Sequence, residues 1–280
     1  TAAVAPRFDK SRALALAFAL SGLGIGAALT PVAIGSAEVA FGWRVAYPVT
    51  ALAWTAIVFP LVFLFFERGI DPASRRAAPQ DQNASVWTEL RSPILLRLIL
   101  AGFSMTFIIL GVNAHLVPIL VEQSMDRDTA VWIAGLIGLG SIVGRIGTGV
   151  LLDYYQTAKV AAAVFLLPFA GCALLLLASG SYPTALTAAL LIGLALGAEF
   201  DVLAYLASRY FPAEELGSRF SWIMMACGIA GGLGPVSAGL TRDLAGLYSP
   251  YLIALLPISL LSASLLASLP SFSQSAGPEA

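Results

Sequence analysis

Arg145 is the residue of this sequence with the most conspicuous chemistry, because it lies inside an apolar run, eight residues before Asp153. An arginine within a membrane-spanning helix costs at least about 2.5 kcal/mol, so it needs a partner or water. On a helix, Ser141 and Thr148 share its face, and we expect this polar stripe to line a cavity. A guanidinium group can bind a carboxylate through two parallel hydrogen bonds. The alternative is a structural ion pair with an acid on the helix predicted over 184–209 or in a loop.

Two acids, Glu199 and Asp201, lie near the middle of one predicted helix. Positions two residues apart on a helix are separated by about 200°, so the two carboxyl groups cannot face one cavity. Asp201 shares a stripe with Gly193 and Gly197, a small-residue face that packs against a neighbouring helix, which predicts a buried structural acid. Glu199 points elsewhere and is a candidate carrier of a coupling proton. A fixed ion pair is the alternative for Glu199.

His115 is the only histidine of the chain, and it shares a helical stripe with Gly111. Histidine changes its charge near neutral pH, which suits proton coupling. Pro118, one turn later, is expected to free backbone carbonyls and to bend the helix. A hydrogen-bonded interior histidine is the favoured alternative. Asn113 faces a different direction and is expected to bridge helices, and both His115 and Asn113 are kept as candidate substrate contacts.

The composition requires these residues to be carried by membrane-spanning helices. The 280 residues are 59% hydrophobic and 11% charged, whereas an ordinary soluble domain is roughly 25% charged. This composition excludes a soluble enzyme, a disordered chain and a nucleic-acid binder with a basic face. Runs of about 20 apolar residues predict helices and not the short alternating strands of a barrel. The expected fold class is therefore an all-α, polytopic membrane protein with transmembrane helices over 13–38, 45–66, 94–121, 130–152, 160–179, 184–209, 220–241 and 250–269.

The basic residues predict the orientation of these spans, because cytoplasmic loops carry an excess of Lys and Arg. With both termini in the cytoplasm, most of the 15 basic residues fall on that side, and only Arg44, Arg127 and Arg242 fall on the other. An even number of spans agrees with this arrangement. We therefore expect a multi-pass protein of the cell (inner) membrane with both ends of this chain cytoplasmic.

A polar stretch from Glu67 to Ser92 separates the first two predicted helices from the other six. It contains a proline-rich and charged sequence that is typical of a linker outside the membrane. The predicted organisation is the end of an N-terminal bundle over 1–66, a cytoplasmic linker over 67–93, a six-helix bundle over 94–270 and a disordered tail over 271–280.

A weak internal repeat relates the first and the seventh predicted spans. Pro31 precedes Gly42 by eleven residues, and Pro235 precedes Gly246 by the same distance. Such repeats are the sequence trace of many transporter folds, and one unit would be six helices long. Coincidence is the alternative, because Pro and Gly are frequent in membrane helices. Close helix contacts are predicted at four small-xxx-small pairs, which are Gly22/Gly26, Gly140/Gly144, Gly193/Gly197 and Gly228/Gly232.

Several segments carry motifs of a known family. Residues 144–153 read GRIGTGVLLD, residues 111–118 read GVNAHLVP, and residues 197–201 read GAEFD. Together with SRALA at 11–15 and GWR at 42–44, they resemble the major facilitator superfamily. The first segment resembles its G-x-x-x-D signature, which ends a helix and enters a short cytoplasmic loop, here 153–159. Residues 111–118 resemble helix seven of the monocarboxylate and oxalate/formate antiporter-like branch. Residues 197–201 resemble helix ten of bacterial members, and residues 11–15 and 42–44 resemble helix five with its outer turn.

The resemblance implies a bacterial transporter of twelve helices, of which this chain, truncated at its N-terminal end, would supply helices five to twelve. In the monocarboxylate-like branch an arginine at the position of Arg145 faces the carboxylate of the substrate, although Ser141 stands where animal-type members carry an acid. Gly149 and Asp153 would belong to the cytoplasmic gate, and ordinary solvation at the membrane surface is the alternative for Asp153. Because helices one, two and four line the cavity in this family, the chain alone is not expected to transport.

These observations predict a secondary active transporter of a small organic solute, most specifically a carboxylate or other organic anion, that works by alternating access as a symporter or antiporter. A non-transporting receptor or assembly subunit and an intramembrane enzyme are the alternatives. The chain is not expected to be an enzyme, because it lacks a nucleophile–base pair or a metal cluster at membrane depth. No cofactor, metal or nucleic acid is expected to bind. The expected partners are an anionic small molecule, the lipid bilayer and protons as coupling ion, and the full-length protein is expected to be a monomer.

Overall fold

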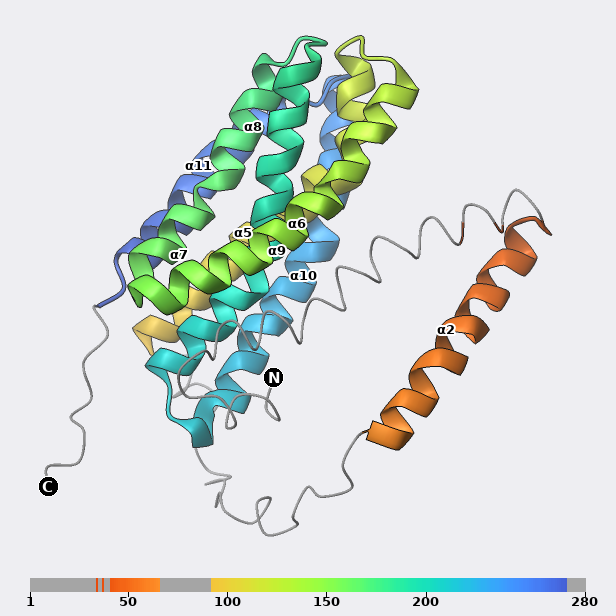
Figure 1. Ribbon diagram of the computed structural model, residues 1–280. Helices are drawn as coiled ribbons and strands as arrows, with labels where there is room; N and C mark the ends of the chain where they lie inside the picture. Colours follow the sequence, from red (N-terminus) through yellow and green to blue (C-terminus); the bar gives the residue numbers. More distant parts are fainter. Residues whose placement is uncertain (1–33, 35–36, 38–40, 66–91, 271–280) are drawn as a thin grey trace, which may run out of the picture. The chain divides into compact units, whose positions relative to one another are not determined.

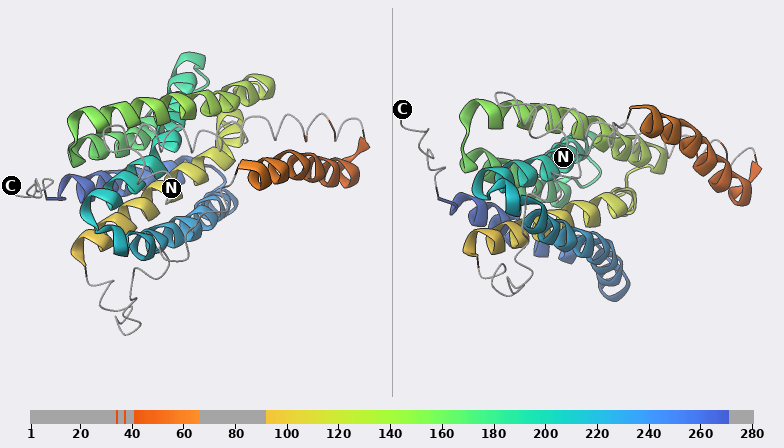
Figure 2. Two further views of the ribbon diagram at one scale, coloured as in Figure 1. Left: turned by 60° about the horizontal axis from the view of Figure 1, so that its bottom comes forward. Right: turned by 90° about the horizontal axis from the view of Figure 1, so that it is seen from below.

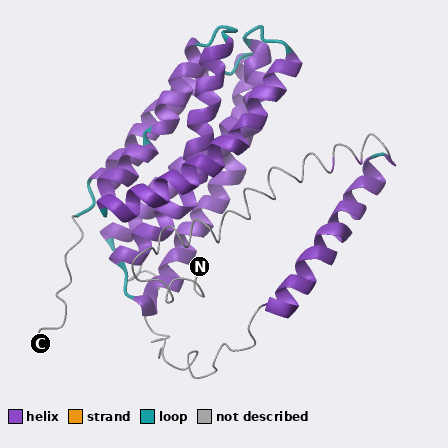
Figure 3. Cartoon of the chain, in the orientation of Figure 1, coloured by secondary structure: helices purple, strands orange, loops and turns teal. Residues whose placement is uncertain are grey.

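The structure is a computed structural model, and it describes residues 34, 37, 41–65 and 92–270 (Figure 1). Contacts within the chain divide it into two compact units, residues 22–85 and the remaining residues, and each unit is considered by itself. The described residues form helices and connecting loops and no strands (Figure 3). The helices are α2 (Trp43–Phe65), α5 (Pro93–Glu122), α6 (Arg127–Tyr155), α7 (Ala158–Phe165), α8 (Leu167–Leu177), α9 (Tyr182–Tyr210), α10 (Ala213–Ala245) and α11 (Ser249–Ala267).

Six helical segments in the described part of the larger unit are long and apolar enough to cross a membrane, with α7 and α8 together forming one of them. They coincide with the six spans that the sequence predicts between 94 and 269, and the largest difference is at α10, which begins at Ala213 and not at 220. The predicted span over 45–66 corresponds to α2. The all-α fold class is therefore confirmed. The predicted span over 13–38 and the tail over 271–280 lie outside the described residues, except for positions 34 and 37.

Short polar residues and glycines determine where several helices begin and end. The carboxylate of Asp126 accepts the backbone N–H groups of Asp128 and Thr129, at 3.1 and 3.2 Å, and so caps the start of α6. Gly246 follows the last residue of α10 with a φ of +78°, and Gly42 precedes α2 with a φ of +75°. Only a residue without a Cβ adopts this left-handed conformation at little cost.

Helices α6 and α9 approach each other closely along two facing rows of glycine, which confirms the predicted pairs Gly140/Gly144 and Gly193/Gly197 as contact sites. A Cβ added at Gly140 would lie 3.1 Å from the Cα of Gly193, and one at Gly144 would lie 2.6 Å from the Cα of Leu194. A Cβ at Gly197 would overlap the backbone of Ser141. The two backbones are therefore in direct contact, as small residues at a helix interface allow.

Helix α10 makes a comparable contact with α5, but through Gly111 and Gly234, which are not among the predicted small-xxx-small pairs. A Cβ added at Gly234 would overlap the Phe107 carbonyl, and one at Gly111 would lie 3.1 Å from the Gly234 carbonyl carbon. The predicted contact pair Gly228/Gly232 has no counterpart in the described part of the chain, because a Cβ at either position would meet no described atom within 4 Å, and it stays a prediction. The face of α10 that packs on α5 lies on the other side of the helix from that pair.

The third span of the larger unit is broken into α7 and α8 at Leu166. Pro168 lacks the N–H that would continue the helical hydrogen bonds, so a break one turn earlier is expected. The hydroxyl of Ser259 on α11 donates to the carbonyl of Phe165 at 3.3 Å, which provides a donor where the helical pattern is interrupted. The break is therefore stabilised by the neighbouring helix.

The helices of the larger unit form one bundle, in which α7 and α8 pack on α11 and α9 (Figure 2). At one end of this bundle, called the Tyr210 end, the guanidinium of Arg97 donates to the carbonyl of Ser268 at 2.7 Å, and the Tyr210 hydroxyl donates to the carbonyl of Pro270 at 2.6 Å. Arg97 thus places a cation at the C-terminal end of α11, where the helix dipole favours one. The opposite end, where α5 and α10 finish, is called the Glu122 end.

Candidate functional site

The close contact of α6 with α9 brings Arg145 and Asp201 together inside the bundle. Nη1 of Arg145 lies 3.5 Å from Oδ1 of Asp201, and the two residues are 6% and 4% exposed. The glycines Gly144 and Gly197 lie next to this pair on their respective helices and permit the short distance between the backbones. The geometry matches the ion-pair alternative for Arg145 and the buried-acid interpretation of Asp201. The role of Arg145 as a substrate contact stays a prediction.

The ion pair leaves one carboxylate oxygen without a partner. The 3.5 Å contact is at the long limit of a hydrogen bond, and Oδ2 of Asp201 is buried with no hydrogen-bond partner among the described residues. Ser141 does not fill this place, because its hydroxyl donates to the carbonyl of Gly138 on its own helix at 2.8 Å. A buried acceptor without a donor is unfavourable, so this oxygen is the least satisfied polar atom of the pair.

The polar stripe of α6 is covered by packing in this unit. Ser141 and Thr148 are 9% and 5% exposed. A groove of about 400 Å³ between α6, α7, α8 and α9 reaches Thr148, and its other lining side chains are apolar residues such as Val143, Leu151 and Leu194. The described residues thus place the stripe at the α6–α9 contact, and the expected cavity along it stays a prediction.

Glu199 faces a different neighbour from Asp201, as the 200° separation requires. Its side chain is 1% exposed and forms a hydrogen bond with the hydroxyl of Thr106 on α5. No described cation pairs with Glu199, so the fixed ion pair that the sequence left open is absent from the described part of the chain. A buried carboxyl group with one neutral partner is far better accommodated with its proton than without it.

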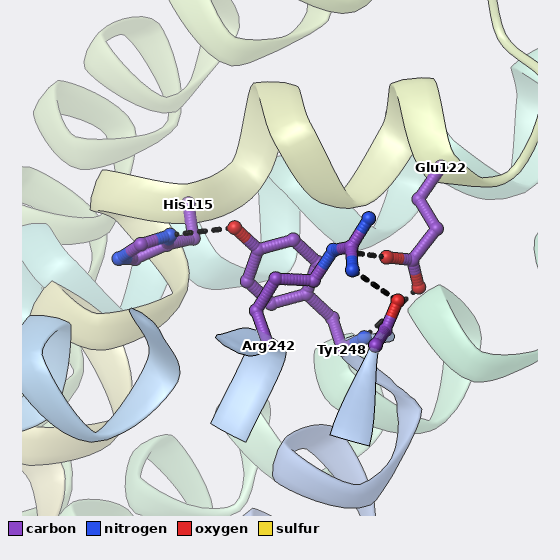
Figure 4. Close-up of polar contacts among 5 residues, drawn as sticks. His115, Glu122, Arg242 and Tyr248 are labelled. Atoms are coloured by element: carbon purple, nitrogen blue, oxygen red, sulfur yellow. Dashed lines mark hydrogen bonds and ion pairs between the residues drawn. The ribbon is translucent and has the colours of Figure 1, made fainter. Parts of the chain in front are cut away.

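His115 is held by two hydrogen bonds at the Glu122 end. Nδ1 lies 2.9 Å from the hydroxyl oxygen of Tyr248 (Figure 4). Nε2 lies 3.1 Å from the carbonyl oxygen of Pro235. A carbonyl oxygen can only accept, so in the neutral ring Nε2 carries the hydrogen and Nδ1 accepts from Tyr248. This geometry is that of a hydrogen-bonded interior histidine. Asn113 is exposed on another face of α5, and the substrate contacts of both residues stay predictions.

Sequence reasoning missed the ion pair that continues this network. Oε2 of Glu122 lies 2.9 Å from Nε of Arg242, and Oε1 accepts the backbone N–H of Tyr248 at 2.9 Å (Figure 4). Burial raises the pKa of the Tyr248 hydroxyl, an effect that nearby Arg242 opposes and Glu122 adds to. The seven-residue spacing of His115 and Glu122 could have indicated this network in the sequence, because residues seven apart lie on one face of a helix.

The gate motif lies at the Tyr210 end. Gly149 is buried and Asp153 is half-buried in the last turns of α6, and the hydroxyl of Tyr205 on α9 donates to the carbonyl of Leu152 at 3.3 Å. The loop after the motif is shorter than the predicted 153–159, because α6 continues to Tyr155 and α7 begins at Ala158. Thr157 caps α7 through the N–H of Lys159, which explains the early start. The gate role itself stays a prediction.

The larger unit is a bundle of membrane-length helices that encloses a buried ion pair, and the comparison with known families gives the family to which it belongs. The profile of the Major Facilitator Superfamily matches residues 1–235 of the chain. The chain belongs to this superfamily.

Three curated relatives bear the names of transport or efflux proteins. The chain is similar to an MFS transporter named asaE from Aspergillus flavus, with 22% identity over 255 residues, which cover 88% of this chain and 55% of the relative. It is also similar to the agnestins efflux protein from Paecilomyces divaricatus, with 25% identity over 83% of this chain and 52% of the relative. An MFS-type transporter from Gibberella moniliformis is 24% identical over 86% of this chain and 57% of the relative.

The chain therefore spans about half the length of the curated relatives that it matches. All three relatives are fungal, and they lend no support to a bacterial source or to the monocarboxylate-like branch. Both of these inferences from the sequence stay predictions, whereas the membership of the superfamily is confirmed.

Proposed function

We propose that the protein to which this chain belongs is a secondary transporter that moves a small organic anion across a membrane by alternating access, coupled to protons. The observation that carries the proposal is the buried pair of Arg145 and Asp201, whose carboxylate has one oxygen without a hydrogen-bond partner. A membrane protein of the major facilitator type keeps such charges at membrane depth at considerable cost, and substrate or proton binding is the usual reason.

At this site the carboxylate of Asp201 and a carboxylate of the substrate would compete for the guanidinium group of Arg145. With Asp201 ionised, Arg145 is neutralised by its neighbour on α9. When a proton binds at Oδ2, Asp201 becomes neutral and Arg145 is left with an unbalanced positive charge. A carboxylate of the substrate then restores the balance, because the planar guanidinium can donate two hydrogen bonds to it. Proton and anion would therefore bind together, which is the requirement for symport.

Glu199 is the second candidate for a coupling proton. Its carboxyl group is buried, accepts a hydrogen bond from Thr106 and has no described cation beside it, which supports a role as a proton carrier. His115 is a weaker candidate for direct coupling, because both of its ring nitrogens are engaged by Tyr248 and Pro235. The proposal thus assigns proton exchange to the acids of α9 and not to the histidine of α5.

The arrangement of the whole protein is part of the proposal. We infer that residues 1–66 end the N-terminal helical bundle, that 67–93 form a cytoplasmic linker and that 94–270 form the C-terminal bundle. The relatives are about twice as long as their match to this chain, which supports a parent protein with four further helices. Both termini of the chain would be cytoplasmic, and Gly149 and Asp153 would lie at the cytoplasmic gate. The complete protein would act as a monomer.

The test is uptake of labelled small carboxylates by the full-length protein in proteoliposomes, with and without a proton gradient. Arg145→Lys and Arg145→Ala are expected to lose uptake, and Asp201→Asn is expected to bind the anion without a response to the proton gradient. Arg127→Ala is the matched control, because Arg127 is an exposed arginine at the start of the same helix. Unaltered uptake in both Arg145 variants would eliminate this residue as the anchor for the anion.

The agnestins efflux protein suggests a second candidate, export of a larger natural product. A transporter of this kind would move its substrate out of the cytoplasm and would not require Arg145 for an uncharged substrate. Accumulation by inverted but not by right-side-out vesicles, with full activity of Arg145→Ala, would favour export over anion symport.

A further inference from the structure

The Glu122 end of the bundle carries a polar network that takes no part in the proposed anion site (Figure 4). The carboxylate of Glu122 accepts from Nε of Arg242 at 2.9 Å and from the backbone N–H of Tyr248 at 2.9 Å. Arg242 also donates to the carbonyl of Gly246, and the Tyr248 hydroxyl bonds to His115 at 2.9 Å. Two side chains of α5 therefore hold one residue of the turn between α10 and α11.

The two holding residues lie on one face of α5, on either side of a proline. His115 and Glu122 are seven residues apart, which is two helical turns or about 10 Å along the axis. Pro118 lies between them and lacks the N–H that the carbonyl of Ala114 would otherwise accept. The last turn of α5 is therefore joined to the rest of the helix by fewer hydrogen bonds than an ordinary turn. The contacts of Glu122 hold that turn from outside.

Residues of α5 supply the hydrogen-bond partners for the polar groups of Tyr248 in the turn between α10 and α11. Tyr248 precedes the first residue of α11, and its own side chain makes no capping bond to that helix. Glu122 supplies a carboxylate at this helix start instead, where the exposed N–H groups favour a negative charge. Tyr248 is 6% exposed, and because burial raises the pKa of its hydroxyl, the phenol keeps the hydrogen that His115 accepts. Asp243, the remaining charged group near Tyr248, lies on α10.

We propose that Glu122 and His115 form a two-point latch that fixes the α10–α11 turn to α5, and that its release lets the last turn of α5 move about Pro118 during the transport cycle. The latch itself is a property of the protein at rest. Its release rests on the proposed function, because release needs a transport cycle in which the latch opens. The contacts of the latch residues described above do not include Arg145 or Asp201, so loosening the latch leaves this ion pair in place.

Hydrogen–deuterium exchange of the full-length protein in lipid nanodiscs tests the latch without any substrate. Glu122→Ala removes both bonds of the carboxylate, and Tyr248→Phe removes only the hydroxyl that His115 accepts from. Glu122→Ala is expected to raise the exchange rate of amides 246–252 on the order of tenfold, because it removes a hydrogen bond to a charged group. Tyr248→Phe is expected to raise it by about threefold, because the bond it removes joins two neutral groups. Glu215→Ala is the matched control, because Glu215 pairs at 2.5 Å with Arg219 of its own helix at the other end of α10. Unchanged exchange of the turn in both latch variants would overturn the latch.

Uptake kinetics of the same variants test the release. Loosening the latch is expected to change the maximal rate at least about twofold and to leave the half-saturating substrate concentration unchanged, since a contact remote from the substrate alters rate and not binding. Faster exchange of the turn together with a wild-type maximal rate would refute release as a step of the cycle. Absence of uptake in the wild-type protein would count against the proposed function, whereas the exchange result would still decide whether the latch exists.

Discussion

The glycine contact between α6 and α9 makes a sharp prediction about two neighbouring substitutions. Gly144→Ala places a methyl group 2.6 Å from the Cα of Leu194, whereas ordinary contacts of this kind begin at 3.4 Å. Helix α9 would have to retreat by at least about 0.8 Å, the difference between these two distances, because the carbonyl oxygen of Leu194 lies nearer still to the added methyl group. A movement of that size would also stretch the 3.5 Å contact of Arg145 with Asp201 beyond the 4 Å limit of an ion pair. Overpacking of this kind typically costs about 1–3 kcal/mol.

Gly147→Ala is the matched control on the same helix. A methyl group at Gly147 meets no described atom within 4 Å, and alanine is a better helix former than glycine by about 0.8–1.0 kcal/mol. The two substitutions are therefore expected to have opposite signs: Gly144→Ala lowers the midpoint of thermal unfolding and Gly147→Ala leaves it equal or higher. For a chain of this size each kcal/mol corresponds to about 2–4 °C.

A thiol-reactive fluorescent dye gives a direct assay of this difference. Cys172 and Cys227 are buried, at 0% and 2% exposure, so they react with the dye only when the bundle opens. The midpoint of the dye signal on heating is compared among the wild type and the two glycine variants. Equal midpoints for Gly144→Ala and Gly147→Ala would refute the conclusion that α6 and α9 are in backbone contact at Gly144.

Three further predictions concern individual polar contacts. Ser259→Ala removes the donor to the Phe165 carbonyl at the α7–α8 break and is expected to cost about 1 kcal/mol, measured by the same dye assay; no loss would mean that the break does not need this bond. Arg145→Ala alone leaves the Asp201 carboxylate buried and unpaired and is expected to lower the free energy of unfolding by about 3–5 kcal/mol. Replacing both residues by Ala is expected to lower it by less. A double variant that is less stable than the single one would contradict this reasoning. Burial raises the pKa of Tyr248, so the protein is expected to lose stability as the pH rises above about 10, the ordinary pKa of tyrosine. Tyr248→Phe is expected to lose less stability than the wild type between pH 9 and 11. Identical pH profiles of stability would exclude Tyr248 as a source of the loss.

The sequence predicted the helices well because a membrane-spanning helix must satisfy its backbone internally and present an apolar surface, and both demands are visible in composition. It also separated Glu199 from Asp201 correctly, since the angle between two positions on a helix is fixed by geometry. The start of α10 was placed too late because the polar first turns of this helix, up to Arg219, read as a loop. Hydropathy reports the apolar part of a helix and not its ends.

Contacts between distant residues were harder to predict. The pairing of Arg145 with Asp201 was one of two alternatives, because a sequence shows that a buried charge needs a partner but not which partner is nearest. The pair Gly228/Gly232 was chosen by its spacing, yet Gly234 makes the close contact with α5. The sequence carried no prediction for Glu122, and Arg242 was placed only on the side of the membrane opposite to the cytoplasm, since the separation of the two residues hides the turn that joins them.

The left-handed backbone conformation of Gly42 and Gly246 determines which stereoisomer of another amino acid these two turns would accept. Gly42 and Gly246 share a φ near +75° to +78°, and neither has a described atom within 4 Å of the place where a Cβ would be. The obstacle to a side chain is thus stereochemical and not steric crowding, and an L-residue pays about 1–2 kcal/mol there. A D-residue has the mirror-image preference, so D-alanine introduced at either turn by chemical synthesis should fit where L-alanine strains the backbone. The turn before α2 and the turn after α10 therefore favour glycine or a D-amino acid for the same reason, although they lie in different units of the chain.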